Sequence, residues 1–258
     1  MPKLAANLSM LFTEIDFLDR FQAAAKAGFK GVEYLFPYAY DKQTLATLLK
    51  ENGLVQVLHN LPAGNWDAGE RGIACHPDRV DEFKDGVARA IDYAQALHCP
   101  KVNCLVGKTP AGADAETVEH TLVSNLKHAA AELQKAGILL VMEPLNDFDT
   151  PGFHLTHTAQ AVDLIQKVGS DNLKVQYDIY HMQRMEGELG NTLSKQLASI
   201  GHIQLADNPG RHEPGTGEIN YGWLLHHIDA IGYEGWIGCE YKPATRTQDG
   251  LGWIKAFA

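Results

Sequence analysis

Eight apolar runs of strand length recur along this chain, separated by segments with helical period. The runs are KLAANLSM (3–10), GVEYLF (31–36), LVQVLHN (54–60), KVNCLVG (101–107), ILLVMEP (138–144), LKVQYDIYH (173–181), IGHIQLADN (200–208) and GWIGCEYKP (235–243). Continuous apolar runs are typical of strands buried on both faces, as in a parallel sheet, whereas half-exposed strands alternate between apolar and polar residues.

The intervening segments have the spacing of amphipathic helices. In the first of them, Phe17, Phe21 and Ala24 share one stripe, and Gly28 follows where a helix would end. Similar segments span 80–97, 116–137, 158–169 and 221–232. Eight strand-and-helix units in 258 residues predict an α/β fold, a (β/α)8 TIM barrel that forms one domain over residues 1–258. A doubly wound sheet is the alternative, but the turn NLSMLFTE after the first strand lacks the glycines of a phosphate-binding turn.

The net charge and the cysteines indicate which kind of ligand and which cellular compartment to expect. The net charge is −10 and no Lys/Arg cluster is present, which argues against a nucleic-acid partner. The four cysteines are scattered without a CxxC pair, as expected of reduced thiols that pack as small apolar groups. No signal-peptide pattern and no membrane-length apolar run occurs. We therefore expect a cytoplasmic protein that acts on a small molecule, and a homo-oligomer stays open.

Polar residues stand near the carboxyl ends of the predicted strands, where a barrel of this type builds its active site. They are Asn7, Glu33, His59, Asn103, Glu143, Asp178, Gln204 and Glu240. Singly, such residues are more often caps or turn formers than ligands. The last four differ, because the same kind of group recurs at the same position on four successive strands.

Three buried carboxylates at one end of a barrel would repel each other and would be costly to desolvate unless a cation lies among them. A cation explains why Glu143 ends a buried strand, and Pro144 then fixes the backbone that aims it. All four candidate ligands offer oxygen, which favours Mg²⁺, with Mn²⁺ as the alternative, over Zn²⁺. The competing interpretation is that the carboxylates pair with arginine or lysine. Arg71 and Arg211 are the obvious candidates, and both lie in glycine-rich loops suited to reaching a ligand.

With these residues the sequence resembles the hydroxypyruvate isomerase family, which is related to xylose isomerase and the ketose 3-epimerases. The resemblance extends over nearly the whole chain. It is sharpest in NLPAGNWDAGERGIA (60–74), VNCLVG (102–107), EPLN (143–146), QYDIYHMQ (176–183) and HIQLADNPGRHEPGTGEINY (202–221). It implies a xylose isomerase-like TIM barrel that binds a divalent metal ion and functions in carbohydrate metabolism.

The resemblance also implies roles for individual residues. Glu143 and Glu240 correspond to the pair of acid/base glutamates that also bind the metal, and Asp178 and Gln204 to the other two ligands. The sugar epimerases usually have histidine where this chain has Gln204. The expected substrate contacts are His59, Arg71, Asn103, His181 and Arg211. Among them an arginine in a loop suits a substrate carboxylate, which it can bind through paired hydrogen bonds.

The implied reaction is the interconversion of the aldose and ketose forms of a small 2-oxo or hydroxy acid. The candidates are hydroxypyruvate to tartronate semialdehyde and the 2-oxo-tetronate analogue, with proton transfer through an enediolate. Three alternatives stay open: ketose 3-epimerisation on the same scaffold, a non-catalytic sugar-acid binding protein, and a multi-zinc nuclease of the endonuclease IV type. The nuclease would need further histidine ligands and a basic DNA-binding face, and the acidic charge argues against it.

Overall fold

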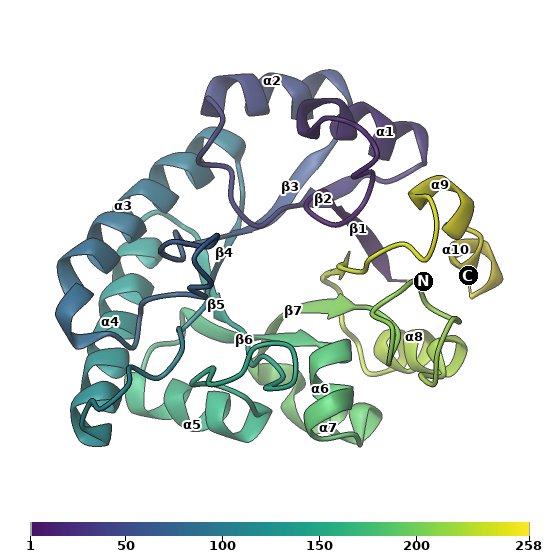
Figure 1. Cartoon of the computed structure of the whole chain (residues 1–258). Coiled ribbons are helices and arrows are strands. Elements are labelled where there is room, and N and C mark those ends of the chain that lie inside the picture. The colour runs from purple at the N-terminus through teal and green to yellow at the C-terminus, as the bar shows by residue number, and fades with distance from the viewer. Residues whose placement is uncertain (1, 258) are drawn as a thin grey trace.

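Eight parallel strands close into a barrel in chain order (Figure 1). The computed structural model describes residues 2–257. The strands are β1 (Lys3–Asn7), β2 (Gly31–Glu33), β3 (Val55–Asn60), β4 (Lys101–Cys104), β5 (Leu139–Met142), β6 (Leu173–Asp178), β7 (Ile200–Leu205) and β8 (Trp236–Cys239). The last strand pairs with the first, from Lys3↔Trp236 to Ala6↔Cys239, and this pairing closes the cylinder. The predicted (β/α)8 barrel is confirmed, and the doubly wound alternative is wrong.

Helices surround the barrel on its outer face (Figure 1). They are α1 (Arg20–Lys26), α2 (Lys42–Glu51), α3 (Val80–Leu97), α4 (Ala115–Lys135), α5 (Thr158–Val168), α6 (Ile179–Met185), α7 (Leu189–Gln196), α8 (Tyr221–Ala230), α9 (Thr247–Gly250) and α10 (Trp253–Ala256). Three single turns of 3-10 helix accompany them, namely η1 (Phe17–Asp19), η2 (Pro77–Arg79) and η3 (Leu197–Ser199). None of the described helices has both the length and the apolar content that crossing a membrane requires.

Sequence signals for helix ends agree with the structure. Asp41 and Asp114 cap α2 and α4, and each side chain accepts a hydrogen bond from the backbone N–H of a threonine three residues later. Helix α5 ends at Gly169, whose backbone is left-handed with φ 66°, a conformation that glycine adopts without strain.

The main apolar core lies between the strands and the surrounding helices. On α3, Phe83, Val87 and Ala90 are buried at helical spacing. Burying a large apolar side chain of this kind contributes about 1.5–3 kcal/mol. The four cysteines also are free and buried, in agreement with the expected reduced thiols.

A second, smaller apolar cluster comes from residues of alternate strands. It contains Ala5, Val57, Leu58 and Val141, with Leu139 and Trp236 packed against it. Side chains two positions apart on a strand share a face, so Asn7, Asn60 and Glu143, which follow Ala5, Leu58 and Val141 by two residues, lie on the same side as the cluster. The sequence thus places an apolar layer in the barrel and polar groups nearer the carboxyl ends of the strands.

Candidate active site

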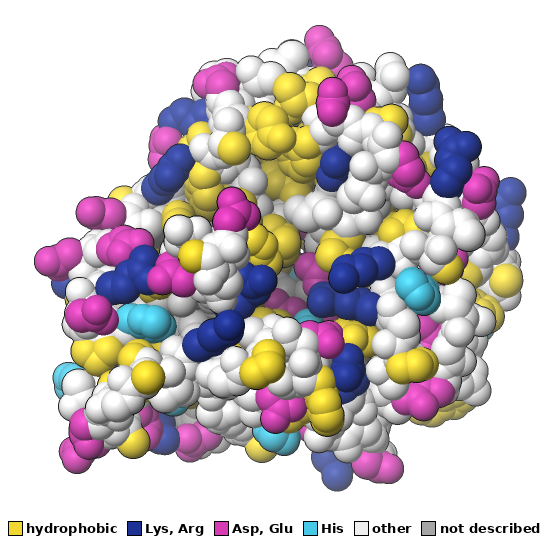
Figure 2. Space-filling view, viewed as in Figure 1, with side chains coloured by type: hydrophobic (Ala, Val, Ile, Leu, Met, Phe, Trp, Pro, Cys, Tyr) yellow, Lys and Arg dark blue, Asp and Glu magenta, His cyan; other side chains and the backbone are white. Residues whose placement is uncertain are grey.

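A cavity of about 710 Å³ lies at the carboxyl end of the barrel. Segments that follow the strands form its walls, which include Asn60, Arg71, Glu143, His181, Arg211 and Glu240. In Figure 2, dark blue Lys and Arg side chains surround a hollow near the centre of the view, with magenta Asp and Glu side chains among them. The position agrees with the one expected from the fold.

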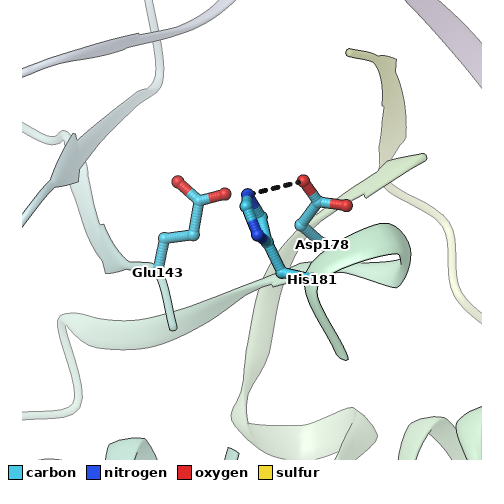
Figure 3. A group of neighbouring side chains, drawn as sticks. All are labelled: Glu143, Asp178 and His181. Atoms are coloured by element: carbon cyan, nitrogen blue, oxygen red, sulfur yellow. Dashed lines mark ion pairs between the residues drawn. The ribbon is translucent and has the colours of Figure 1, made fainter. Parts of the chain in front are cut away.

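Two carboxylates and one imidazole meet beside this cavity (Figure 3). Glu143 directly follows β5, Asp178 ends β6, and His181 lies in α6. Each of the three offers one ligand atom, and these atoms all lie within 4.8 Å of one another. Asp178 reaches its place as the N-cap of α6, because its Oδ1 accepts a hydrogen bond from the backbone N–H of Tyr180 at 2.8 Å.

Glu240 joins this group through Arg211. The Arg211 guanidinium donates to Glu240 Oε2 at 2.7 Å and lies 3.8 Å from Asp178 Oδ2. Arg211 has a left-handed backbone with φ 55°, which is uncommon for a residue other than glycine. Its carbonyl accepts a hydrogen bond from the backbone N–H of Lys242 at 2.8 Å, which ties the Arg211 loop to the segment after β8.

Burial and mutual repulsion disfavour the ionised form of these carboxyl groups. Burial raises the pKa of Glu240 from 4.5 to about 8, against the opposing effect of Arg211. Burial likewise raises the pKa of Asp178 to about 6. The pKa of Glu143 lies well above its ordinary range because of burial first and then the charges of Glu240 and Asp178. Burial tends to lower the pKa of Arg211, but Glu240 and Asp178 outweigh that effect and raise it.

The donor set fits a hard divalent cation. Glu143 Oε1 and Asp178 Oδ2 are buried without a hydrogen-bond partner in the described part of the chain. Unpaired buried oxygens are costly, and a cation between carboxylates would remove both that cost and the repulsion. Of the ligands expected from the sequence, Glu143 and Asp178 lie close enough to share one ion. Glu240 is linked to Asp178 through Arg211.

The proton on His181 can be assigned from its partners. Its Nδ1 accepts the backbone N–H of Asn146 at 3.1 Å and faces the Asn146 side-chain amide at 2.6 Å. Burial also holds its pKa well below the usual range. A neutral ring whose Nδ1 accepts must carry its proton on Nε2. Nε2 lies 3.5 Å from Asp178 Oδ2 (Figure 3), so His181 is suited to donate its proton to that carboxylate or to a substrate oxygen, the contact expected from sequence, rather than to ligate a cation. Asn146, the last residue of EPLN, thus fixes the orientation of His181.

Gln204 lies below the cavity rather than on its wall. Its Nε2 donates to Glu33 Oε1 at 2.7 Å, and its Oε1 accepts from Gln176 at 2.6 Å. Gln176 in turn lies near Glu143 and lowers its pKa. No hydrogen bond found in residues 2–257 joins Gln204 directly to the three carboxylates, and the connection runs through these amides.

Asn103 and His59 both stand near strand ends, but only Asn103 lies at the candidate site. Asn103 Nδ2 donates to Glu143 Oε2 at 3.1 Å and approaches Asn60 Oδ1 at 3.3 Å, so Asn103 contacts the candidate acid/base residue itself. His59 is not brought to the cavity. It packs against Tyr38, which contacts Tyr93 of α3, and Asn60 lines the cavity in its place. Adjacent residues on a strand face opposite sides, so both cannot point inward.

Arg71 reaches the cavity from the long segment 61–77. Its guanidinium lies 3.8 Å from the Trp66 ring centroid and donates to the backbone carbonyls of Trp66 and Glu70 at 3.0 and 2.6 Å. No carboxylate of residues 2–257 pairs with it. The segment is anchored at Gly72, where a Cβ would lie 1.9 Å from the Leu105 carbonyl oxygen, so the close approach requires glycine.

Sequence reasoning missed the amides that orient the carboxylates. Asn7 appeared only as a strand-end residue, yet its Nδ2 donates to both Glu33 and Glu240 at 3.0 and 3.1 Å. Gln176 was not singled out, although it lies two residues before Asp178 and therefore on the same strand face. That period of two is the signal that could have identified it.

Comparison with known proteins assigns the family. The model of the xylose isomerase-like TIM barrel family matches residues 21–257. The chain belongs to this family. Among the xylose isomerase-like barrels, it is 60% identical over 257 residues to the hydroxypyruvate isomerase of Escherichia coli K12, and the match covers 100% of both chains. It is 44% identical to the 2-oxo-tetronate isomerase of Cupriavidus necator, covering 100% of this chain and 99% of that one. The resemblance to the hydroxypyruvate isomerase family is confirmed, and the protein is an isomerase.

Solved structures agree on the xylose isomerase-like fold. A crystal structure named AP endonuclease, family 2, from Brucella melitensis superposes with a TM-score of 0.97 at 44% identity, covering 99% of each chain. L-ribulose 3-epimerase has a TM-score of 0.78 at 22% identity and covers 99% of this chain and 86% of its own. At that identity the similarity concerns the fold alone.

Proposed function

We propose that this protein interconverts the aldose and ketose forms of a small 2-oxo or hydroxy acid. The observation that carries the proposal is a pair of buried carboxyl groups, Glu143 and Glu240, that line one cavity. A general acid or base must lie within hydrogen-bond reach of the proton that it transfers, and both groups border the same space. The named activities of the relatives at 60% and 44% identity support hydroxypyruvate, or a 2-oxo-tetronate, as the substrate.

The proton transfer needs one group to accept a proton from carbon and another to return one. In hydroxypyruvate, one glutamate removes a proton from C3, which yields an enediolate across C2 and C3. The other glutamate returns a proton at C2, and the hydroxyl proton moves from the oxygen on C3 to the oxygen on C2. The product is tartronate semialdehyde, and atoms and charge balance.

Other residues orient the reactants. The His181 Nε2–H donates to a substrate oxygen, and Arg71 binds the substrate carboxylate with its guanidinium free of carboxylate partners. Asn103 donates a hydrogen bond to Oε2 of Glu143 and so fixes the orientation of this carboxyl group. A divalent ion held by Glu143, Asp178, Gln204 and Glu240, Mg²⁺ first and Mn²⁺ second, would polarise the neighbouring substrate oxygens and stabilise the enediolate.

Isosteric amide variants test the proposal. Glu143→Gln and Glu240→Gln should each lower turnover of hydroxypyruvate by roughly 10²-fold or more, the usual scale for a general acid or base. Glu116→Gln, at an exposed position in the first turn of α4, is the matched control with unchanged turnover. Near-normal rates in both active-site variants would refute the assignment.

Solvent isotope incorporation distinguishes the reaction classes. In D₂O the isomerase should place deuterium on C2 of the tartronate semialdehyde formed from hydroxypyruvate, and chelator should abolish the exchange until Mg²⁺ or Mn²⁺ is added. A 3-epimerase would instead return label to the carbon that lost its proton in a ketose. Binding of the acid without any exchange would indicate a binding protein.

A further inference from the structure

A fourth buried carboxylate lies in the barrel beneath the candidate active site. Glu33 ends β2 and is fully buried. Its carboxylate accepts three hydrogen bonds, from Asn7 and Gln204 at Oε1 and from His202 at Oε2, with distances of 3.0, 2.7 and 2.7 Å. No lysine or arginine of residues 2–257 forms an ion pair with it. Glu33 does not line the cavity, and the hydrogen bonds of its carboxylate in the described residues go to these three neighbours.

We propose that Glu33 is a positioning residue that fixes the amide of Gln204 and, through Asn7, the carboxylate of Glu240. This inference rests on the proposed function, in which Gln204 and Glu240 hold the cation. It adds a role for a residue that the reaction scheme does not use.

Glu33 determines the orientation of the Gln204 amide. A side-chain amide can present either its oxygen or its NH₂, and only the oxygen can ligate a cation. A carboxylate only accepts hydrogen bonds, so Glu33 requires the NH₂ of Gln204 to face it. The Gln204 oxygen must then face the other way, where one lone pair accepts from Gln176 and the second stays available. Glu33 thereby selects the ligating orientation.

Glu33 is also connected to Glu240, through Asn7. The two hydrogens of the Asn7 amide bridge Glu33 Oε1 and Glu240 Oε1, and Asn7 Oδ1 is held by the backbone N–H of Ser9 at 3.1 Å. Glu240 is thus fixed at Oε1 by Asn7 and at Oε2 by Arg211. Without an acceptor at Glu33, the Asn7 amide would lose one of the contacts that hold it in place.

The backbone of β8 leaves room for this arrangement. Gly238 is the register partner of Gln204, and a Cβ at Gly238 would lie 2.2 Å from Glu33 Oε1. Any larger residue would displace the carboxylate from its three donors. The glycine therefore matches the position of Glu33 across the barrel.

Two substitutions of Glu33 can separate the effect of its charge from the effect of its length, because His202 can change its tautomer. Its Nδ1 is buried without a partner while Nε2 donates to Glu33. In Glu33→Gln, the new amide oxygen can stay at the Oε1 position, and the NH₂ can donate to His202 Nε2 once the histidine proton moves to Nδ1. Glu33→Gln thus loses the charge but keeps the acceptor for Asn7 and Gln204. Glu33→Asp keeps the charge but is one methylene too short.

The test measures Mn²⁺ affinity of the chelator-treated full-length protein by titration calorimetry, with thermal unfolding as the check on folding. Replacing residues that orient metal ligands typically weakens binding by about 10- to 100-fold. We expect about that loss in Glu33→Asp and a change of less than about 3-fold in Glu33→Gln. An equal or larger loss in Glu33→Gln would overturn the positioning role, because the charge rather than the acceptor would then matter.

A double-mutant cycle with Gln204→Leu supplies the second measurement. If Glu33 acts through Gln204, the loss caused by Glu33→Asp should be at least about 3-fold smaller when Gln204 is already replaced. Losses that multiply in full would overturn the inference while leaving Mn²⁺ binding by the unmodified protein intact. No Mn²⁺ binding by the unmodified protein would instead refute the proposed metal site, and the inference with it.

Discussion

Replacing Glu240 with glutamine should make the cation-free protein progressively more stable relative to wild type as the pH rises. The folded protein holds the Glu240 proton until about pH 8, whereas the unfolded chain releases it near pH 4.5. Between these values the folded state binds the extra proton, so wild-type stability falls with increasing pH. Glutamine does not titrate and removes this contribution.

The magnitude follows from the pKa of Glu240. Each pH unit between the two pKa values corresponds to roughly 1.4 kcal/mol, so ionising this carboxyl group in the fold costs about 5 kcal/mol in full. From pH 6 to pH 8 the difference between variant and wild type should grow by about 2 kcal/mol. For a chain of this size that difference corresponds to about 4–8 °C in Tm. A constant offset comes in addition, because an amide and a protonated carboxyl group differ in their hydrogen bonds with Arg211.

The assay is urea unfolding of both proteins in EDTA at pH 6, 7 and 8. Buried histidines titrate alike in both, so their contribution cancels in the difference. A difference that stays constant across this range would refute the claim that burial and like charge, rather than Arg211, dominate at Glu240. Saturating Mn²⁺ should stabilise wild type more at pH 8 than at pH 6, since the ion then replaces the proton.

Two further variants test groups on either side of the barrel wall. Arg71→Ala should raise KM for hydroxypyruvate by about 10-fold or more, the scale of a lost charge-assisted contact. KM for neutral ketoses should change by less than about 3-fold. Equal increases in KM for both kinds of substrate in steady-state assays would contradict a carboxylate contact. The free energy of unfolding of His59→Leu should rise by about 2 kcal/mol relative to wild type as the pH falls from 7 to 5. Burial lowers the pKa of His59 from 6.5 to about 4, so wild type loses stability as the pH falls through that window. Parallel urea curves at the two pH values would contradict this.

The strand-end carboxylates could be predicted because they depend on local pattern. Each of Glu143, Asp178 and Glu240 ends an apolar run, and the barrel brings the carboxyl ends of all strands to one rim. The structure places Asp178 beside Glu143, and Arg211 contacts both Asp178 and Glu240. Closure of the barrel thus brings Glu143 and Asp178 together, and Arg211 links Glu240 to them.

Which side chains of β3 face into the barrel could not be predicted in the same way. The sequence Leu58-His59-Asn60 has two polar residues in succession, and either could face inward. A register shift between Val32 and Glu33 in the β2–β3 pairing decides the question, and this irregularity has no signal in the run itself. The amide bridges from Asn7 and Gln176 depend on residues far apart in the chain, which local periodicity does not relate.

Charge pairing around the cavity gives the final argument for an acidic substrate. Four cationic side chains line the cavity, Arg71, Arg184, Arg211 and Lys242. Arg211 is occupied by Glu240 and Asp178, and Arg184 pairs with Asp149 at 2.9 Å. In the described part of the chain, Arg71 and Lys242 have no carboxylate partner.

A chain with a net charge of −10 would repel an anion at long range, so binding an anionic substrate requires a local excess of positive charge. Arg71 supplies it beside an aromatic ring that holds the guanidinium in place. A substrate carboxylate therefore has a reason to bind Arg71 before Arg211, because the Arg211 guanidinium already contacts both Glu240 and Asp178.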